Sequence, residues 1–426
     1  MPAADVTLYS EPQGGQAAVL FAPAGSDAFT TPLVAKTGAD GRLSVRMRLD
    51  SIAGRATVGV RAADLTDTAT ITITSGKPVR IDASPRDTTL YLSVGYRLVA
   101  TGRDRYRNPV PVQRTPSPRA AVEGEQVRSP QLGRHYVALQ SGTVQDTARF
   151  SVVPPGVIAA QRGGFRPNSS TSFKEVVTLQ LDGSNRQLVT GADWTHDVIP
   201  RWFAGGDSLL IFEDRPHTYV GKAAFGEPGM RAVNLRDLTP RWLAPTSDNA
   251  WIYLSASAEY QEAKLGYQIW RMRPDLSGAE MVTAFARMQF DHKPDVSPDG
   301  QRLAFVRGYF HGGPTELWIR DLATGVETRL ADSVGLVRWS PSGTRIAYLT
   351  GGRLVIADAQ GGTPQLVAAG ISEFAWSPDG AHVIVAVAPQ AGLAARLHVL
   401  ILATGEAIPL SWSRDKDTYY RGPDWR

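Results

Sequence analysis

Residues 291–306 read DHKPDVSPDGQRLAFV, and this stretch recurs in altered form along the C-terminal two thirds of the chain. At its centre, Pro298 presets a turn-compatible φ, Asp299 can hydrogen-bond nearby backbone, and Gly300 tolerates a positive φ. The turn joins two short apolar runs. The stretch therefore predicts a β-hairpin.

Six copies of this motif appear when the chain is aligned on the residue that precedes the turn. They centre on Trp202, Trp242, Val296, Trp339, Trp376 and Trp425. The spacings are 40, 54, 43, 37 and 49 residues, and a period in the forties is that of a four-stranded propeller blade. A large aromatic that recurs once per blade is expected to pack between neighbouring blades, because no blade buries both its faces alone.

The first blade lacks an inner strand of its own. Residues 157–162, 175–181 and 186–190 read as second, third and fourth strands, with no tryptophan-bearing strand before them. The missing pattern lies at the other end of the chain, in residues 422–426 (GPDWR). We therefore expect this C-terminal strand to close a six-bladed ring, which removes an open sheet edge.

These repeats resemble a known family, the WD-like repeats of TolB-type β-propellers. The resemblance is carried by the S-P-D-G turns at 297–300 and 377–380, the variant S-P-S-G at 340–343, the preceding Trp339 and Trp376, and D-L-A-T-G at 321–325. It covers roughly residues 157–426. It is specific for the fold and not for the function, because this repeat serves unrelated binding proteins and some enzymes.

The N-terminal part alternates apolar and polar residues in short runs between Gly, Asp and Pro clusters, which is typical of half-buried sandwich strands. Here Thr37, Asp40, Gly41 and the pair Ala53-Gly54 resemble bacterial Ig-like domains of the invasin and intimin type, as do residues 90–100 and 135–153. The sequence thus predicts an all-β chain with two Ig-like β-sandwich domains, 1–76 (with a shortened first strand) and 77–153, and a propeller at 154–426.

Composition excludes several classes of protein. The chain has 426 residues and no cysteine, which excludes disulfides, thiolate metal sites and cysteine nucleophiles. Its net charge of +4 is too small to favour nucleic acid as a partner. No apolar run approaches the roughly 20 residues needed to cross a bilayer, and the first residues show no signal peptide.

Propeller topology sorts the loops onto two faces. The connections between blades and the loops between second and third strands emerge on one face, and they are also the longest loops, where binding residues concentrate. We predict a ligand-binding site at the channel mouth on this face. Its candidate residues are His196, Asp197, His217, Tyr260, Asp291, His292, Tyr309, Phe310, His311 and Tyr419.

No catalytic or metal-binding signature accompanies these residues. The chain contains no H-x-H, H-E-x-x-H, G-x-S-x-G, G-x-G-x-x-G or phosphate-binding loop. We therefore predict no catalytic residues, no metal and no cofactor, and we interpret the repeated tryptophans as core.

The sequence favours a non-enzymatic bacterial envelope or secreted protein, located in the periplasm, at the cell surface or outside the cell. The TolB resemblance implies that the channel mouth docks a protein or peptide partner. Two alternatives stay open at the same face. A carbohydrate-active lyase or hydrolase would need convergent carboxylates or a metal, and a carbohydrate-binding adhesin would use the loop aromatics.

Overall fold

The computed structural model describes residues 3–11, 18–49, 51–165, 172–190, 199–213, 219–224, 231–234, 238–260, 263–264, 266–284, 288–387, 396–414 and 418–426. Strands dominate these residues, and their one helical element is a 3-10 turn, Ser411–Arg414. The chain divides into two compact units. The first comprises Met1–Arg86, Gly95–Arg128 and Tyr136–Arg149, and the second comprises Asp87–Val94, Ser129–His135 and Phe150–Arg426. The predicted all-β class is confirmed.

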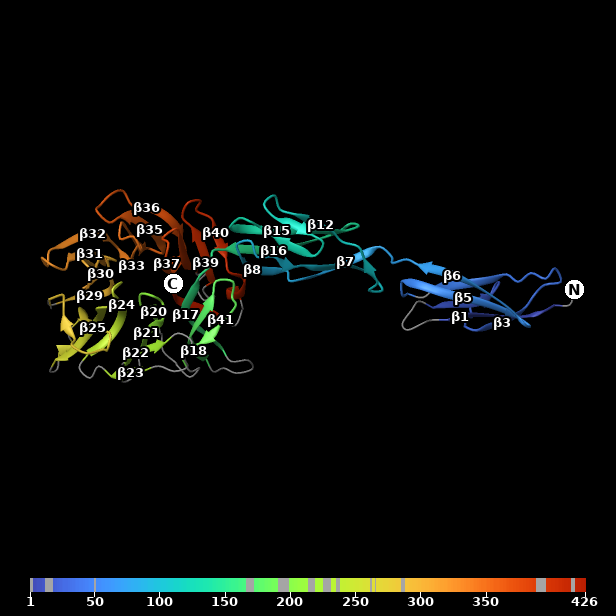
Figure 1. The fold of residues 1–426 in the computed structure, drawn as a ribbon, viewed down its shortest axis with the longest axis horizontal. Helices are drawn as coiled ribbons and strands as arrows, with labels where there is room; N and C mark the ends of the chain where they lie inside the picture. Colours follow the sequence, from blue (N-terminus) through green and yellow to red (C-terminus); the bar gives the residue numbers. More distant parts are fainter. Residues whose placement is uncertain are drawn as a thin grey trace. The chain divides into compact units, whose positions relative to one another are not determined.

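The N-terminal strands of the first unit form two facing sheets. One has the order β3-β1-β5-β6 (Figure 1) and the other pairs β2 with β4. The strands are β1 (Asp5–Glu11), β2 (Val19–Pro23), β3 (Leu33–Lys36), β4 (Val45–Leu49), β5 (Gly54–Ala62) and β6 (Leu65–Ile73). Val19, Phe21, Leu33, Ala56 and Ile73 form the core between the sheets, as the alternating pattern predicts.

Three further sheets follow in the chain, with the orders β11-β10-β7, β12-β15-β16-β8 and β13-β14-β9. Their strands are β7 (Pro78–Ser84), β8 (Asp87–Tyr91), β9 (Tyr96–Arg97), β10 (Val99–Asp104), β11 (Pro109–Val110), β12 (Gln113–Pro116), β13 (Ala121–Glu123), β14 (Gln126–Arg128), β15 (Gly133–Ser141) and β16 (Val144–Val153). The assignment of residues 1–76 and 77–153 to two Ig-like domains stays a prediction.

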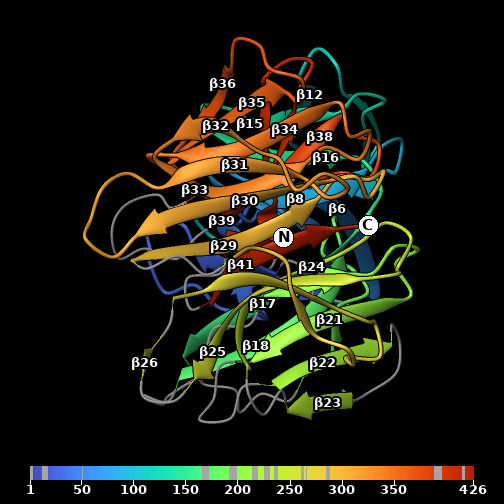
Figure 2. The same ribbon diagram turned by 90° about the vertical axis from the view of Figure 1, so that its left-hand side faces the viewer.

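Six antiparallel sheets of the second unit are the blades of a propeller (Figure 2). Blade 1 is β19-β18-β17-β41, namely Gln187–Leu188, Ser172–Gln180, Val157–Phe165 and Thr418–Trp425. Blade 2 is β20 to β23, namely Pro200–Trp202, Ser208–Glu213, Tyr219–Ala224 and Arg231–Asn234. Blade 3 is β24, β25, β27 and β28, namely Leu238–Pro245, Ile252–Tyr260, Gln268–Met272 and Glu280–Met281, with β26 (Ala263–Lys264) beside β25.

Blades 4, 5 and 6 repeat the same order of strands. Blade 4 is β29 to β32, namely Gln289–Val296, Arg302–Tyr309, Glu316–Asp321 and Glu327–Asp332. Blade 5 is β33 to β36, namely Val334–Trp339, Arg345–Thr350, Arg353–Asp358 and Gln365–Ala369. Blade 6 is β37 to β40, namely Ile371–Trp376, His382–Val387, Arg396–Ile401 and Ala407–Pro409.

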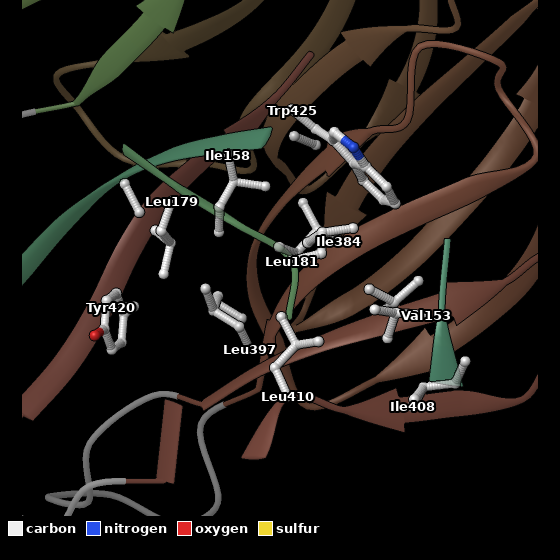
Figure 3. Packing of buried hydrophobic residues seen from close by; sticks show 14 of the residues in the cluster. Val153, Ile158, Leu179, Leu181, Ile384, Leu397, Ile408, Leu410, Tyr420 and Trp425 are labelled. Carbon is white, nitrogen blue, oxygen red and sulfur yellow. The ribbon is translucent and has the colours of Figure 1, made fainter. Parts of the chain in front are cut away.

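The ring is closed by the C-terminal strand, as predicted. Strand β41 pairs antiparallel with β17, in a register that places Trp425 opposite Ile158. The buried cluster that results joins blade 1 to blade 6, and Figure 3 shows Trp425 beside Ile384 of β38. Both ends of the propeller sequence therefore share one sheet.

Three anchor tryptophans, Trp202, Trp339 and Trp376, donate hydrogen bonds from the indole to the preceding blade. The indole Nε1 of Trp339 donates to the carbonyl of Asp295 at 3.2 Å, and that of Trp202 donates to the carbonyl of Asp424 at 3.2 Å. The guanidinium of Arg302 in blade 4 lies 4.6 Å from the Trp339 ring centroid. Each such indole is thus held by both its edge and its face.

The third copy of the motif has a different anchor from the one that the sequence predicts. The turn bond from Thr246 N to Trp251 O matches that from Ser340 N to Arg345 O, so the residue that corresponds to Trp339 is Pro245. Trp242 lies three residues earlier on β24, and the prediction that it is this blade's anchor is wrong. A register shift between Pro240 and Trp242 accompanies the change.

Candidate functional site

Four inner strands place a buried charge one residue before the anchor position, where the side chains meet in the central channel. The Arg201 guanidinium pairs with Asp295 at 3.0 Å and with Asp424 at 3.4 Å, and Arg338 lies 3.6 Å from Asp295. Burial raises the pKa of Asp295 to about 6, against the opposing effect of the Arg201 charge. Burial also raises the pKa of Asp424. The charges of these two acids and two arginines are therefore paired with one another.

A second layer of the channel is built around Trp242. Its side chain, from blade 3, packs against the buried cluster formed by blades 5 and 6, so the indole reaches across the channel. The Nζ of Lys293 lies 5.4 Å from the Trp242 ring centroid and donates a hydrogen bond to the carbonyl of Gly335. Burial lowers the pKa of this lysine. The Trp242 indole therefore occupies part of the channel between blade 3 and blades 5 and 6.

A cavity of about 750 Å³ lies at the channel mouth on the face formed by the repeated turns. Its walls combine aromatic rings, turn prolines and backbone: Trp202, Phe203, Trp376 and Trp425 supply rings, and Pro245, Pro298, Pro341 and Pro378 supply the rim. Asp424, Ser247 and Arg426 add polar groups. The Arg426 guanidinium is 4.6 Å from the Trp202 ring centroid. An opening of this size and lining suits an extended peptide or a small organic ligand.

Five of the predicted site residues lie together on blade 4, at the ends of β29 and β30 that point away from the turns. Asp291 pairs with Arg307 across the two strands, and Tyr309 pairs with Gln289. His292 follows on β29, and Phe310 and His311 follow β30. Tyr419 lies on β41 opposite Gly163 in blade 1, so the structure does not bring it to this group.

The remaining predicted residues are His196, Asp197, His217 and Tyr260. The first three lie outside the described residues, and Tyr260 is described only by its backbone, as the last residue of β25. Most of the loops that we predicted to form this face are likewise outside the described ranges.

Asp291 already has a partner within its own blade. Arg307 donates to its two oxygens from Nε at 2.7 Å and from Nη2 at 2.9 Å, and donates to Glu327 from Nη1 at 2.8 Å. The Asp291 side chain is 2% exposed. Burial raises its pKa, against the lowering effect of Arg307. This carboxylate is held in a structural ion pair.

The other four residues of the group, together with Phe290, form what we call the blade-4 aromatic patch. Its members are Phe290, His292, Tyr309, Phe310 and His311. The Phe290 ring centroid is 5.3 Å from that of His292 and 5.2 Å from that of Phe310. Burial lowers the pKa of His292 to about 3, so its imidazole is neutral at physiological pH. Phe310 is 55% exposed. The patch offers an apolar, aromatic surface.

The turn-side cavity and the channel charges were not predicted from the sequence. A signal for both exists in the repeats. The residue before the anchor is charged in four copies (Arg201, Asp295, Arg338 and Asp424). The turn after the anchor has proline at its second position in three copies. When the blades are aligned, the charged residues share one position in the repeat and the prolines share another.

Neither a metal-binding cluster nor a membrane-spanning helix occurs among the described residues. Within those ranges, no three His, Asp or Glu side chains are grouped closely enough to hold a metal ion. No helix in the described part of the chain has the length and apolar character needed to span a bilayer.

Comparison with known proteins finds distant sequence relatives and a likeness in fold to solved structures. No family model matches the chain. The uncharacterized peptidase YuxL of Bacillus subtilis is 27% identical over 145 residues, or 30% of this chain and 20% of that protein. A TolB homolog of Chlorobium luteolum is 27% identical over 161 residues, or 37% of this chain and 34% of that protein. The chain thus matches only a fifth to a third of either relative.

Among solved structures, TolB from Acinetobacter baumannii is similar to this chain. The TM-score is 0.52 at 14% sequence identity, with 69% of this chain and 80% of that chain covered. A likeness at this identity concerns the fold. The propeller of this chain is TolB-like.

Proposed function

We propose that this chain is a non-enzymatic binding protein of the bacterial envelope, or a secreted one, whose propeller holds an extended segment of a protein partner. The observation that carries the proposal is the 750 Å³ cavity at the turn-side mouth of the channel. Its rings and prolines suit apolar side chains, and the exposed backbone of the turns suits a peptide main chain.

The pattern of the inter-blade loops predicts a partner at the opposite mouth, where the blade-4 aromatic patch lies. Aromatic side chains are also favoured at protein interfaces, so that patch is the second place for the same activity. Residues on the two faces can be varied separately because the channel charges around Arg201, and the Trp242 side chain, lie between the two faces.

A peptide display selection on the purified chain tests the proposal. Ser247, an exposed residue of the cavity lining, is changed to tryptophan to fill the mouth. The matched control is Gln301→Trp, at an exposed turn residue outside the lining. We expect selected peptides to lose at least about tenfold in affinity with Ser247→Trp and to keep their affinity with Gln301→Trp. A third variant, His292→Ala with Tyr309→Ala and Phe310→Ala, reports on the opposite face.

Selection of no peptide, or of peptides that are insensitive to Ser247→Trp and to the triple alanine variant alike, would contradict the proposal. Sensitivity to the triple variant alone would move the site to the face that the sequence favoured.

Carbohydrate binding is the second candidate, and the exposed Phe310 ring beside Phe290 and Tyr309 supports it, because aromatic faces stack on sugars. A glycan array with Phe310→Ala as the control variant tests it. A lyase or hydrolase would show product formation from any glycan that binds. Its candidate acid-base residues are His196, Asp197, Asp291 and His292, of which the first two lie outside the described residues.

A periplasmic, cell-surface or secreted location belongs to the same proposal. It is supported by the TolB-like fold of the propeller. Fractionation of cells that express the full natural gene would find the protein outside the cytoplasm. Recovery in the cytoplasmic fraction would contradict this part of the proposal.

A further inference from the structure

The two facing sheets of the N-terminal sandwich differ in width. The sheet β3-β1-β5-β6 has four strands, and the sheet opposite has only β2 and β4 among the described residues. A sandwich is stable when the inner faces of both sheets cover each other. Part of the inner face of the wider sheet therefore has no strand opposite it.

The uncovered part is the outer end of β6. Alternate residues of a strand share a face, so the inner face of β6 carries Ile73, Ile71, Ala69, Asp67 and Leu65. Ile73 is 8% exposed and belongs to the core, whereas Leu65 is 78% exposed. The inner face of β6 is therefore buried at Ile73 and exposed to solvent at Leu65.

Strand β4 is incompletely covered on the same side. Met47 pairs with Phe21, and Leu49 pairs with Val19, and directly paired residues lie on the same face of a sheet. Phe21 and Val19 are 1% and 0% exposed, but Met47 and Leu49 are 53% and 47% exposed. The core-facing side of β4 is thus half open to solvent.

A slot of about 160 Å³ occupies this space. It is lined by Met47 of β4, Val58 and Val60 of β5, and Ala69 of β6, together with Leu8, Phe21, Gly59, Asp67 and Thr68. The outer edge of β2 already makes a backbone bridge between Phe21 and Thr30, with both N–O distances 2.8 Å. Within the described residues, the open edge of the small sheet is therefore that of β4.

We infer that β4 accepts an extended strand from a partner polypeptide, which pairs with its open edge and widens the small sheet. Strand addition satisfies backbone groups at an edge and places alternate side chains in pockets. The five residues of β4 fit a donor of similar length. Apolar side chains of the donor would enter the slot beside Met47 and Leu49.

The outward face of β4 determines the charge of the donor. Arg46 and Arg48 lie on that face and are exposed. Arg46 pairs with Asp27 at 2.7 Å, and the Arg48 guanidinium lies 4.7 Å from the Phe29 ring centroid. Pairing β4 with β4 of a second copy would bring these arginines together, and like charges on facing strands are destabilising. The donor is thus an extended segment that alternates apolar with acidic residues.

Fluorescence anisotropy with the full chain and a short labelled peptide tests this inference. The probe alternates valine with glutamate. One control has the same composition in two blocks, and another replaces glutamate by lysine. We expect the alternating acidic peptide to bind at least about tenfold more tightly than either control. No binding of the alternating peptide, or equal binding of the block peptide, would overturn the inference.

Two substitutions in the N-terminal sandwich test whether the peptide binds at β4. Met47→Glu puts a charge in the slot and is expected to weaken binding at least about tenfold. Val34→Glu is the matched control, since Val34 is 65% exposed on the edge strand β3 and lies outside the slot. Equal losses with both variants would overturn the inference, as would a dimer of the peptide-free chain that Met47→Glu dissociates. Ser247→Trp should leave this binding unchanged, which separates it from binding at the propeller.

Discussion

Asp424 in β41 accepts a hydrogen bond from the backbone N–H of Trp202 in β20, at 2.7 Å. The same contact joins Asp295 in blade 4 to the backbone N–H of Trp339 in blade 5, also at 2.7 Å. In both cases a carboxylate one residue before an anchor position reaches the next blade, and in both cases it also pairs with Arg201. The junction that closes the ring and the junction between blades 4 and 5 thus use the same contact between a carboxylate and a backbone N–H.

Replacing Asp424 by alanine is expected to destabilise the closure. The change removes the bond to Trp202 and takes one ion-pair partner from Arg201, whose side chain is 10% exposed. Loss of one partner from a buried ionic contact costs about 3–5 kcal/mol. Chemical denaturation of the full chain measures the change in unfolding free energy.

The control for this variant is Asp332→Ala, at an exposed pair with Arg329. Exposed pairs contribute about 0–1 kcal/mol, so this variant should unfold close to the parent. A similar loss in both variants would contradict a special role for Asp424.

Most of the propeller could be predicted from the sequence, because its repeats are local signals. The turn at Pro298-Asp299-Gly300 and the tryptophans at a regular spacing identify hairpins and blades. The unmatched strand pattern at residues 157–162 predicted closure by Trp425, and the pairing of β17 with β41 confirms it. Here each strand could be recognised from its own residues.

The features that the local sequence patterns did not predict depend on strand register and on packing between blades. Trp242 satisfies the local pattern of an anchor, but the turn register gives that place to Pro245 and sends the indole across the channel. Asp291 was predicted as a site residue from its position, and the strand register sets it against Arg307 within blade 4; its role in binding stays a prediction. The cavity depends on turns from five blades and on the last residues of the chain. Such relationships are fixed by long-range packing, which a local pattern does not report.

Stability should depend on pH through Asp295. Burial raises its pKa to about 6, above the unfolded value of about 4. The folded chain therefore binds more protons between these values, so the contribution of this group to stability is most favourable below pH 4 and is lost as the pH rises to 6. Relative to Asp295→Asn, the parent should gain roughly 2 kcal/mol between pH 7 and pH 4, because the full effect of about two pKa units, at about 1.4 kcal/mol per unit, is reached only below pH 4. Denaturation of both proteins at a series of pH values measures this difference, and a constant difference would contradict the assignment.

Gly156→Ala should strain the closing contact. A Cβ at Gly156 would lie 2.1 Å from Nε1 of Trp425, so the indole must shift from its place in the cluster of blades 1 and 6. Overpacking of this kind costs about 1–3 kcal/mol. Gly335→Ala is the matched control, because the nearest atom to its Cβ would be the Leu349 carbonyl oxygen at 3.9 Å. Equal melting temperatures of the two variants would contradict the expected clash.

Asp291→Ala tests whether this residue supports the fold or only a ligand. Its removal leaves Arg307, with a side chain 10% exposed, without its bidentate partner. We expect a loss of about 3–5 kcal/mol in unfolding free energy. Glu280→Ala, at the more exposed pair with Arg271, should change stability by less than about 1 kcal/mol. Parent-like stability of Asp291→Ala would return this carboxylate to the set of available ligand-binding groups.

The indole of Trp242 packs against the buried cluster of blades 5 and 6 and lies 5.4 Å from Nζ of Lys293 in blade 4. One side chain of blade 3 thus ties this blade to blades that are not its neighbours in the ring. Removing the indole would therefore weaken the ring across its diameter, and not only at one junction between adjacent blades.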